Sequence, residues 1–139
     1  DNFFYSNKNI LKKLLNAKFI QGDINDQDLL IKTLNDFSID AVIHFAAFTD
    51  VRESNLNPLK YYENNLIGSI KLIEAIIKNK SRNKDLKPIP ILFSSSCSVY
   101  GVPKEIPIKE NSLRSPINAY GNTKFFIEKI LENMEKLMN

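Results

Sequence analysis

The sequence has 139 residues, of which 43% are hydrophobic and 25% charged, a composition typical of a water-soluble globular chain of one domain at most. The formal net charge of +3 is spread along the chain, and the densest basic stretch, residues 78–87, has no aromatic residues between its charges, so we expect no nucleic-acid surface. One cysteine excludes an internal disulfide, and with a single histidine it makes no metal-ligand set. No apolar run of membrane-spanning length and no signal peptide are visible, so we expect a cytoplasmic protein without a membrane partner.

The predicted elements alternate between helix and strand along the chain. They are the end of a short amphipathic helix at 9–17, a short strand at 18–21, a helix at 26–37 with Asp26 as N-cap, a buried strand at 40–45, a long helix at 58–80 with Pro58 in its first turn, a strand at 89–94, and a helix from 116 to about 137 that Ser115 caps. This alternation predicts an α/β fold in which helices cover a parallel sheet.

Both long helices carry more apolar residues than one buried face needs. In the helix at 58–80, the helical period places the core face at Leu59, Tyr62, Leu66, Ile70, Ile73 and Ile77. Tyr61, Leu72 and Ile76 then point away from that face. In the last helix, Phe126 and Ile130 lie beside the core stripe rather than on it. Surplus apolar surface of this kind predicts a homodimer built from helices 58–80 and 116–137.

Tyr120 and Lys124, at the start of the last helix, form the strongest chemical pattern. At about 100° per residue they share a core-facing stripe with the apolar residues Ile127, Leu131, Met134 and Met138. A lysine is out of place there, because an unpaired buried ammonium is costly. An ammonium close to a phenol favours the phenolate, so the pair can act as a general base and acid on a hydroxyl. The alternative is a lysine that reaches solvent beside a core tyrosine.

Three serines, Ser94, Ser95 and Ser96, follow the apolar run of the strand predicted at 89–94. In open α/β sheets, ligands bind at the carboxyl ends of the strands, so the serines lie where a substrate is expected. The alternative is a serine-rich turn that only satisfies its own backbone. Together with Tyr120 and Lys124, the serines make a set that suits alcohol–ketone chemistry.

Six segments in a fixed order cover most of the chain: residues 21–24, 42–47, 53–65, 93–96, 99–101 and 115–124. In order and spacing they resemble the extended short-chain dehydrogenase/reductase family, and within it the UDP-glucose 4-epimerases. The resemblance implies a partial Rossmann-like fold over residues 1–139, a doubly wound parallel sheet flanked by helices. It also implies bound NAD and a UDP-sugar substrate.

The resemblance assigns roles to individual residues. The implied catalytic residues are Tyr120, Lys124 and Ser96. The implied cofactor-binding residues are Asp1, Asn2, Asp23, Ile24, Phe45, Ala46, Ala47, Thr49, Asn64 and Ser94, together with Tyr120 and Lys124. Tyr120 would take the proton of the sugar 4-hydroxyl, Lys124 would hold the phenolate and the nicotinamide ribose, and Ser96 would relay the proton. Thr49 and Arg52 depart from the family pattern, in which a lysine and a glycine are common.

The glycines do not form the Gly-rich turn that a dinucleotide pyrophosphate requires. They are Gly22, Gly68, Gly101 and Gly121. In the family that turn precedes the position of Asp1. We therefore expect the chain to be a fragment that lacks the phosphate loop and the later substrate region, and that is inactive alone.

Two alternatives to a UDP-glucose 4-epimerase remain. One is another extended-family nucleotide-sugar enzyme, such as a pentose epimerase or a dehydratase, and the other is an inactive fragment or an NAD-binding regulator. The Cys97-Ser98 pair after Ser96 counts against a dehydratase, because dehydratases of the family usually carry Asp-Glu there. The presence of all three implied catalytic residues counts against a regulator.

Overall fold

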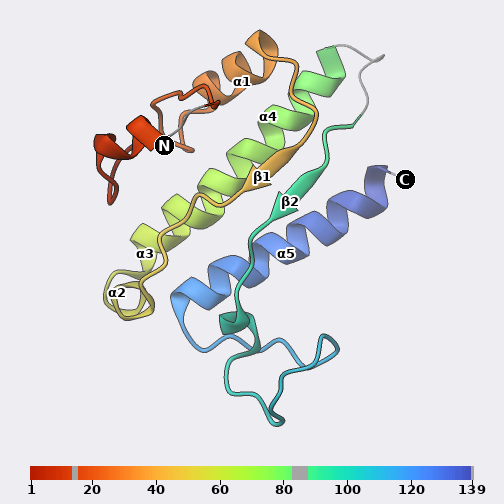
Figure 1. The fold of residues 1–139 in the computed structure, drawn as a ribbon. Helices are drawn as coiled ribbons and strands as arrows, with labels where there is room; N and C mark the ends of the chain where they lie inside the picture. Colours follow the sequence, from red (N-terminus) through yellow and green to blue (C-terminus); the bar gives the residue numbers. More distant parts are fainter. Residues whose placement is uncertain (14–15, 83–87, 139) are drawn as a thin grey trace.

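The computed structural model describes residues 1–13, 16–82 and 88–138 (Figure 1). In chain order, its elements are the 3₁₀-helix η1 (Lys8–Lys13), α1 (Gln27–Asp36), β1 (Val42–His44), α2 (Val51–Leu56), α3 (Pro58–Tyr61), the π-helix η2 (Tyr62–Ile67), α4 (Gly68–Arg82), β2 (Ile91–Phe93), the 3₁₀-helix η3 (Cys97–Tyr100) and α5 (Ala119–Met138). None of the helices among the described residues is both long enough and apolar enough to cross a membrane.

The two strands pair in parallel, which confirms the predicted parallel arrangement. Ile43 lies opposite Leu92 at the centre of the ladder. On one face of the sheet, α4 and α5 cover the pair, as Figure 1 shows for the ribbon. On the other face, Ile43 is 59% and Leu92 64% exposed. The strands are shorter than predicted, and the expectation that residues 40–45 are buried on both faces is wrong, because no described element covers that second face.

The main apolar core lies between α1 and α4. Leu34 of α1 packs with Leu72, Ala75 and Ile76 of α4. Val42 and Ile91 of the sheet pack against this cluster. The N-cap predicted for α1 is confirmed, since the Asp26 carboxylate accepts the Leu29 N–H at 3.0 Å. The core therefore joins the first helix to the covered face of the sheet.

The long helix predicted at 58–80 is present, but with a different buried face. Tyr61, Leu72 and Ile76, expected to point outward, are 0%, 8% and 5% exposed, whereas Leu59 is 80% exposed. The buried face also includes two polar residues, Asn65 and Ser69. The prediction followed apolar residues alone, and it missed that hydrogen bonds allow these two side chains to be buried.

The helix boundaries near the N-terminus also differ from the prediction. Residues 18–21 form no strand among the described residues, although Asp1 N–H contacts the Ile20 carbonyl at 3.4 Å and Gly22 N–H donates to the Asp1 carbonyl at 3.2 Å, the pattern of a single parallel rung. The helix end predicted at 9–17 is the 3₁₀-helix at 8–13, and residues 14 and 15 lie outside the described residues. Of the basic stretch 78–87, residues 78–82 belong to α4 and 83–87 lie outside the described residues.

The last helix begins at Ala119 and not at residue 116. Asn118, rather than Ser115, caps it, because the Asn118 side-chain oxygen accepts the Gly121 N–H at 2.7 Å. Ser115 is held elsewhere: its carbonyl lies against Gly101, where a Cβ would come within 2.0 Å of it and where φ is +63°. Only glycine combines that backbone conformation with that approach.

The core stripe predicted for this helix is confirmed where it is described. Tyr120, Lys124 and Ile127 are 8%, 3% and 1% exposed, and Leu131 and Met134 are half-buried. The side chain of Met138 lies outside the described residues.

Asn65 ties three separate parts of the chain together. Its side-chain oxygen accepts the Phe48 N–H at 2.8 Å, and its amide nitrogen donates to the Phe48 carbonyl at 2.9 Å. The same nitrogen lies 3.3 Å from the Thr123 hydroxyl of α5. Asn65 thus satisfies the backbone after β1 as a neighbouring strand would, and it connects that backbone to α5.

We predict that Asn65→Ala lowers the free energy of unfolding by about 2 kcal/mol or more, because the buried N–H and C=O of Phe48 lose their partner. Urea unfolding measures the change. Glu63→Ala, an exposed position in the same π-helix, is the control and should change stability by less than about 0.5 kcal/mol. Equal effects of the two substitutions would contradict the structural role of Asn65.

Candidate active site

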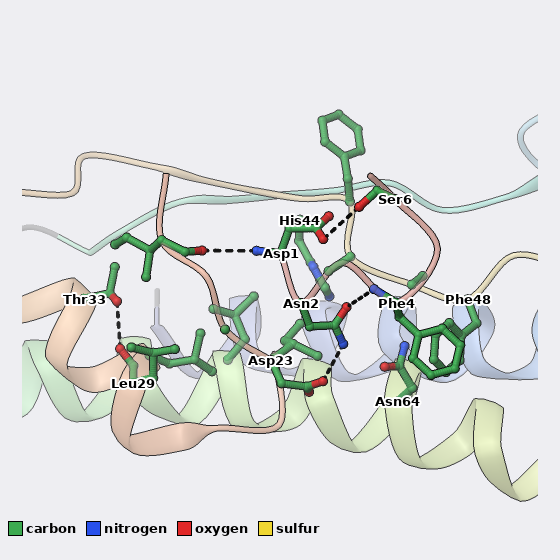
Figure 2. Close-up of a pocket in the computed structure, with 18 of the residues that line it drawn as sticks. Asp1, Asn2, Phe4, Ser6, Asp23, Leu29, Thr33, His44, Phe48 and Asn64 are labelled. Atoms are coloured by element: carbon green, nitrogen blue, oxygen red, sulfur yellow. Dashed lines mark hydrogen bonds between the residues drawn. The ribbon is translucent and has the colours of Figure 1, made fainter. Parts of the chain in front are cut away.

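A cavity of about 610 Å³ lies at the carboxyl end of β1 (Figure 2). The N-terminal segment, residues 20–24, the end of β1 and the π-helix η2 form its walls. It brings together most of the residues that the sequence assigned to cofactor binding, namely Asp1, Asn2, Asp23, Ile24, Phe45, Ala46, Ala47 and Asn64. Residues far apart in the sequence therefore meet in one hollow, with the small side chains of Ala46 and Ala47 at one wall.

Asp1 organises the N-terminal wall of this cavity. One oxygen of its carboxylate accepts the Phe3 N–H at 2.6 Å and the Ser6 hydroxyl at 3.1 Å. Figure 2 shows Ser6 turned toward this carboxylate. Phe3 has φ of +59°, a left-handed conformation that is unusual for a bulky residue. Both hydrogen bonds of the Asp1 side chain in this tight turn use Oδ1, and neither uses Oδ2.

Asp23, which also lines the cavity, is an ionised hydrogen-bond acceptor. The Asn25 N–H at 2.8 Å lowers the pKa of this carboxyl below its usual value, and the Asn2 amide, which donates at 2.6 Å, acts in the same direction. Asp1 and Asp23 both line the cavity, and both carboxylates can accept hydrogen bonds from hydroxyl or amino groups of a ligand. No group of three His, Cys, Asp or Glu side chains in the described part of the chain could hold a metal ion.

Lys124 and the serines form the second part of the site. The Lys124 ammonium is 2.8 Å from the Ser94 carbonyl, 4.7 Å from the centre of the Phe93 ring and 5.9 Å from that of Tyr120. Burial lowers the pKa of Lys124 to about 8, so that it still carries its charge at pH 7. The Ser96 hydroxyl accepts the Ser98 N–H at 3.2 Å and thereby caps η3.

Two residues connect the cavity with this second group. Phe48 lines the cavity and packs in one buried cluster with Tyr61 and Tyr120. His44 also lines the cavity, and its charge is disfavoured by Lys124. The implied cofactor-binding and catalytic residues therefore adjoin one another across Phe48 and His44. Thr49 is the exception, since it is exposed and does not line the cavity.

The N-terminal wall is held by an aromatic and charged cluster that sequence reasoning missed. Glu53 accepts the Tyr5 hydroxyl at 2.8 Å and the Lys60 ammonium at 2.5 Å. The Lys60 ammonium also lies 4.9 Å from the Phe4 ring and 4.7 Å from the Phe48 ring. The run of aromatic residues directly after Asp1 was the available signal, because aromatic side chains this close to a predicted ligand contact need a partner of their own.

His44 is buried against α4 in its neutral form. Its Nε2 lies 2.7 Å from the Ser69 hydroxyl, and that hydroxyl donates its own proton to the Asn65 carbonyl. Nε2 must therefore be the donor to Ser69, which fixes the tautomer. Burial, with a smaller contribution from Lys124, lowers the pKa of His44 from 6.5 to about 4. His44 is thus a buried, hydrogen-bonded residue that lines the cavity.

Comparison with known proteins identifies the family. Residues 3–139 match the family model described as GDP-mannose 4,6 dehydratase. The chain belongs to this family. With UDP-glucose 4-epimerase of Lactobacillus helveticus it is 48% identical over 120 residues, 86% of this chain and 34% of the relative. A bifunctional UDP-glucose 4-epimerase and UDP-xylose 4-epimerase of Pisum sativum is 40% identical over 121 residues, 87% of this chain and 33% of the relative.

Solved structures give the same relationship. UDP-glucose 4-epimerase from Brucella ovis, crystallised with NAD, matches with a TM-score of 0.83 and 38% identity over 96% of this chain and 38% of that chain. The enzyme of Stenotrophomonas maltophila, with bound NAD and formylated UDP-arabinopyranose, gives a TM-score of 0.89 and 29% identity over 100% of this chain and 41% of that chain. The chain thus has the α/β fold of extended short-chain dehydrogenases/reductases, and it spans about a third of the length of the curated relatives it matches.

The neutral, buried His44 predicts a specific dependence of stability on pH. Since its pKa is 6.5 when unfolded and about 4 when folded, the unfolded state binds one more proton between these values. Stability from His44 is therefore present above pH 6.5 and is lost as the pH falls toward 4, by up to about 1.4 kcal/mol per pH unit.

Urea unfolding at several pH values from 7 to 4.5 measures this dependence, with His44→Gln as the matched variant. Glutamine keeps a side-chain N–H donor for Ser69 but cannot take up a proton in this range. The variant should lose less stability than the native protein over the same pH interval. Identical pH dependence in the two proteins would show that His44 does not titrate as described.

Proposed function

We propose that the chain forms the cofactor and catalytic part of a nucleotide-sugar 4-epimerase that uses bound NAD and interconverts UDP-glucose and UDP-galactose. The observation that carries this proposal is the buried ammonium of Lys124. It is held beside Tyr120 and against residues 94–98 at the end of β2, which we call the serine loop. Relatives and solved neighbours named UDP-glucose 4-epimerase support it, as do the NAD and UDP named with several of them.

The cavity residues suit the adenosine end of the cofactor. The Asp1 carboxylate oxygen that does not bind Phe3 can accept hydrogen bonds from the hydroxyls of a ribose. The ionised Asp23 can accept a hydrogen bond from an amino group. Ala46 and Ala47 allow a ligand to approach the backbone after β1, and Asn64 lines the far wall. His44 and Phe48 line the cavity on the side of Lys124 and Tyr120, so a ligand extended along the cavity would approach the second group.

In the proposed reaction, Tyr120 takes the proton from the sugar 4-hydroxyl. The Lys124 ammonium, 5.9 Å from the centre of the Tyr120 ring, holds this tyrosine in place, and its N–H groups that do not bind Ser94 can bind the nicotinamide ribose. Ser96 hydrogen-bonds the same sugar oxygen and relays its proton. NAD, when bound, would supply the hydride acceptor and donor that inversion at the sugar C4 requires. Ser94 contributes its carbonyl, which orients Lys124.

The alternatives are separated by particular observations. Cys97 and Ser98 begin η3 directly after Ser96, at the positions where a dehydratase of the family would carry an acid pair. A dehydratase is therefore the weaker candidate, although the matching family model is named after a dehydratase. The pea relative acts on both hexose and pentose sugars by its name, so a pentose epimerase stays open. The presence of Ser96, Tyr120 and Lys124 together counts against a regulator that only binds NAD. With a single cysteine in the chain, we place the protein in the cytoplasm.

We predict that Tyr120→Phe abolishes epimerisation in the longest natural protein that contains this chain. The ring keeps its packing against Phe48 and Tyr61, but the proton acceptor is lost, which typically costs a factor of about 10² to 10⁴ in rate. Turnover is measured with UDP-galactose, and bound NAD is quantified in both proteins. Near-native turnover by the variant would exclude Tyr120 as the base, whereas loss of bound NAD would indicate misfolding.

We also propose a homodimer through the outer faces of the helix at 58–80 and of α5. Tyr61, Leu72 and Ile76 no longer support it, because they are buried within the chain, and Ile130 is half-buried. The remaining apolar surface includes Leu59, Ile67, Ile77 and Phe126, which are 80%, 43%, 40% and 42% exposed. Exposed apolar residues on neighbouring helices commonly mark a subunit interface.

We predict that Phe126→Glu converts this dimer to a monomer, because it places a charge in the apolar contact. Multi-angle light scattering of the longest natural protein at micromolar concentration gives the mass. Phe4→Glu, which places a charge at an exposed aromatic residue on the N-terminal wall, is the control and should leave the dimer intact. A monomer mass for the native protein would rule the interface out.

A further inference from the structure

Glu128, one turn beyond Lys124 on α5, contacts the serine loop directly. One of its carboxylate oxygens accepts the Ser95 hydroxyl, and the other lies 2.7 Å from the Arg114 guanidinium. Its side chain is 19% exposed, and that of Arg114 is 30% exposed. Glu128 therefore connects the serine loop, the segment before α5 and α5 itself.

Three consecutive turns of α5 meet the same loop. At Gly121, a Cβ would lie 2.7 Å from the Ser98 carbonyl, so that only glycine allows η3 to approach the first turn. At the next turn the Lys124 ammonium donates to the Ser94 carbonyl at 2.8 Å. At the third turn Glu128 accepts the Ser95 hydroxyl. Residues at i, i+3 and i+7 share one face of a helix, so this face of α5 fixes the loop along its length.

Ser96 lies between the fixed positions. The residue before it is held by Glu128, and Ser98, whose N–H its hydroxyl accepts, is held against Gly121. Its own side chain makes no contact with α5 among the described hydrogen bonds. The position of the Ser96 hydroxyl relative to Tyr120 is therefore set by its neighbours, and Glu128 supplies the contact on one side.

Resting on the proposed function, we propose that Glu128, through Ser95, is a positioning residue for the reaction: it holds the serine loop so that Ser96 faces the sugar oxygen on which Tyr120 acts. Arg114 keeps the Glu128 carboxylate in place, because it binds the oxygen that Ser95 does not use. The carboxylate takes no part in proton transfer. Its effect is on the geometry of Ser96, and small displacements of a reacting group have large effects on rate.

Glu132 offers a matched control one turn further along α5. It binds the same Arg114 nitrogen at 2.8 Å and also binds Lys129 at 2.8 Å, but it makes no described contact with the serine loop. A purely structural role of the ion-pair network would make Glu128→Ala and Glu132→Ala equivalent. A positioning role makes only the first affect the site.

The test measures kcat and KM for UDP-galactose in the longest natural protein that contains this chain, for Glu128→Ala, Glu128→Gln, Ser95→Ala and Glu132→Ala. Glu128→Ala and Ser95→Ala should lower kcat by roughly 10- to 100-fold with KM changed by less than about threefold. Their double variant should be no worse than either alone, because both remove the same contact. Glu128→Gln should recover part of kcat, since its amide oxygen still accepts the Ser95 hydroxyl but its NH2 group cannot bind Arg114, and Glu132→Ala should remain near native.

Hydrogen exchange of the Ser98 amide, which Ser96 caps, provides a readout independent of activity. It should accelerate in Glu128→Ala and Ser95→Ala but not in Glu132→Ala. Unchanged Ser98 exchange, or equal kcat in Glu128→Ala and Glu132→Ala, overturns the positioning role. A native protein that is inactive toward every UDP-sugar overturns the proposed function instead, and the exchange measurement then still decides whether Glu128 fixes the loop.

Discussion

The buried ammonium of Lys124 is the constraint on which the arrangement of the site depends. A charge that is 3% exposed requires compensation, and here the Ser94 carbonyl and the faces of Phe93 and Tyr120 supply it. These partners come from the end of β2 and from α5 itself. The helix must therefore lie over the carboxyl end of the sheet, and Tyr120 packs in one cluster with Phe48, which lines the cavity. Removing the ammonium would leave that carbonyl without its described partner.

Buried polar side chains carry this constraint through the rest of the chain. Asn65 satisfies the backbone of Phe48 and reaches Thr123 on α5, while Ser69 binds His44 on the sheet. Asn65 and Ser69 lie on the buried face of the helix at 58–82, at positions where apolar residues could also pack. Their hydrogen bonds specify which face of the helix is buried and how far it is rotated, whereas apolar contacts only require that some face be buried.

This difference explains what could be predicted from the sequence. The helices near 26–37, 58–80 and 116–137, the parallel pairing of the strands near 42 and 91, the N-cap at Asp26 and the buried Lys124 follow from periodicity and from local residue types, and the structure contains each of them. The buried face of the long helix could not be predicted, because burial of Asn65 depends on a backbone 17 residues away in sequence. The start of α5 was misplaced for a similar reason, since Ser115 lies outside the helix with its carbonyl against Gly101, which is distant in sequence. For the candidate site, the resemblance located the residues of the cavity, but Glu53, Lys60 and Glu128 act through contacts that no local pattern contains.

The two parts of the site differ in how they are held, and this difference has a consequence for cofactor binding. Lys124 is buried and is held by the Ser94 carbonyl, whereas the N-terminal wall depends on the exposed Tyr5 and on the partly exposed pair of Glu53 and Lys60. Salt screens exposed charges far more than buried ones. The contacts that hold the wall carrying Asp1 are therefore screened by salt more strongly than the buried contact of Lys124. A ligand bound to Asp1 and to Lys124 at once would connect this screened wall to the helix that carries Lys124.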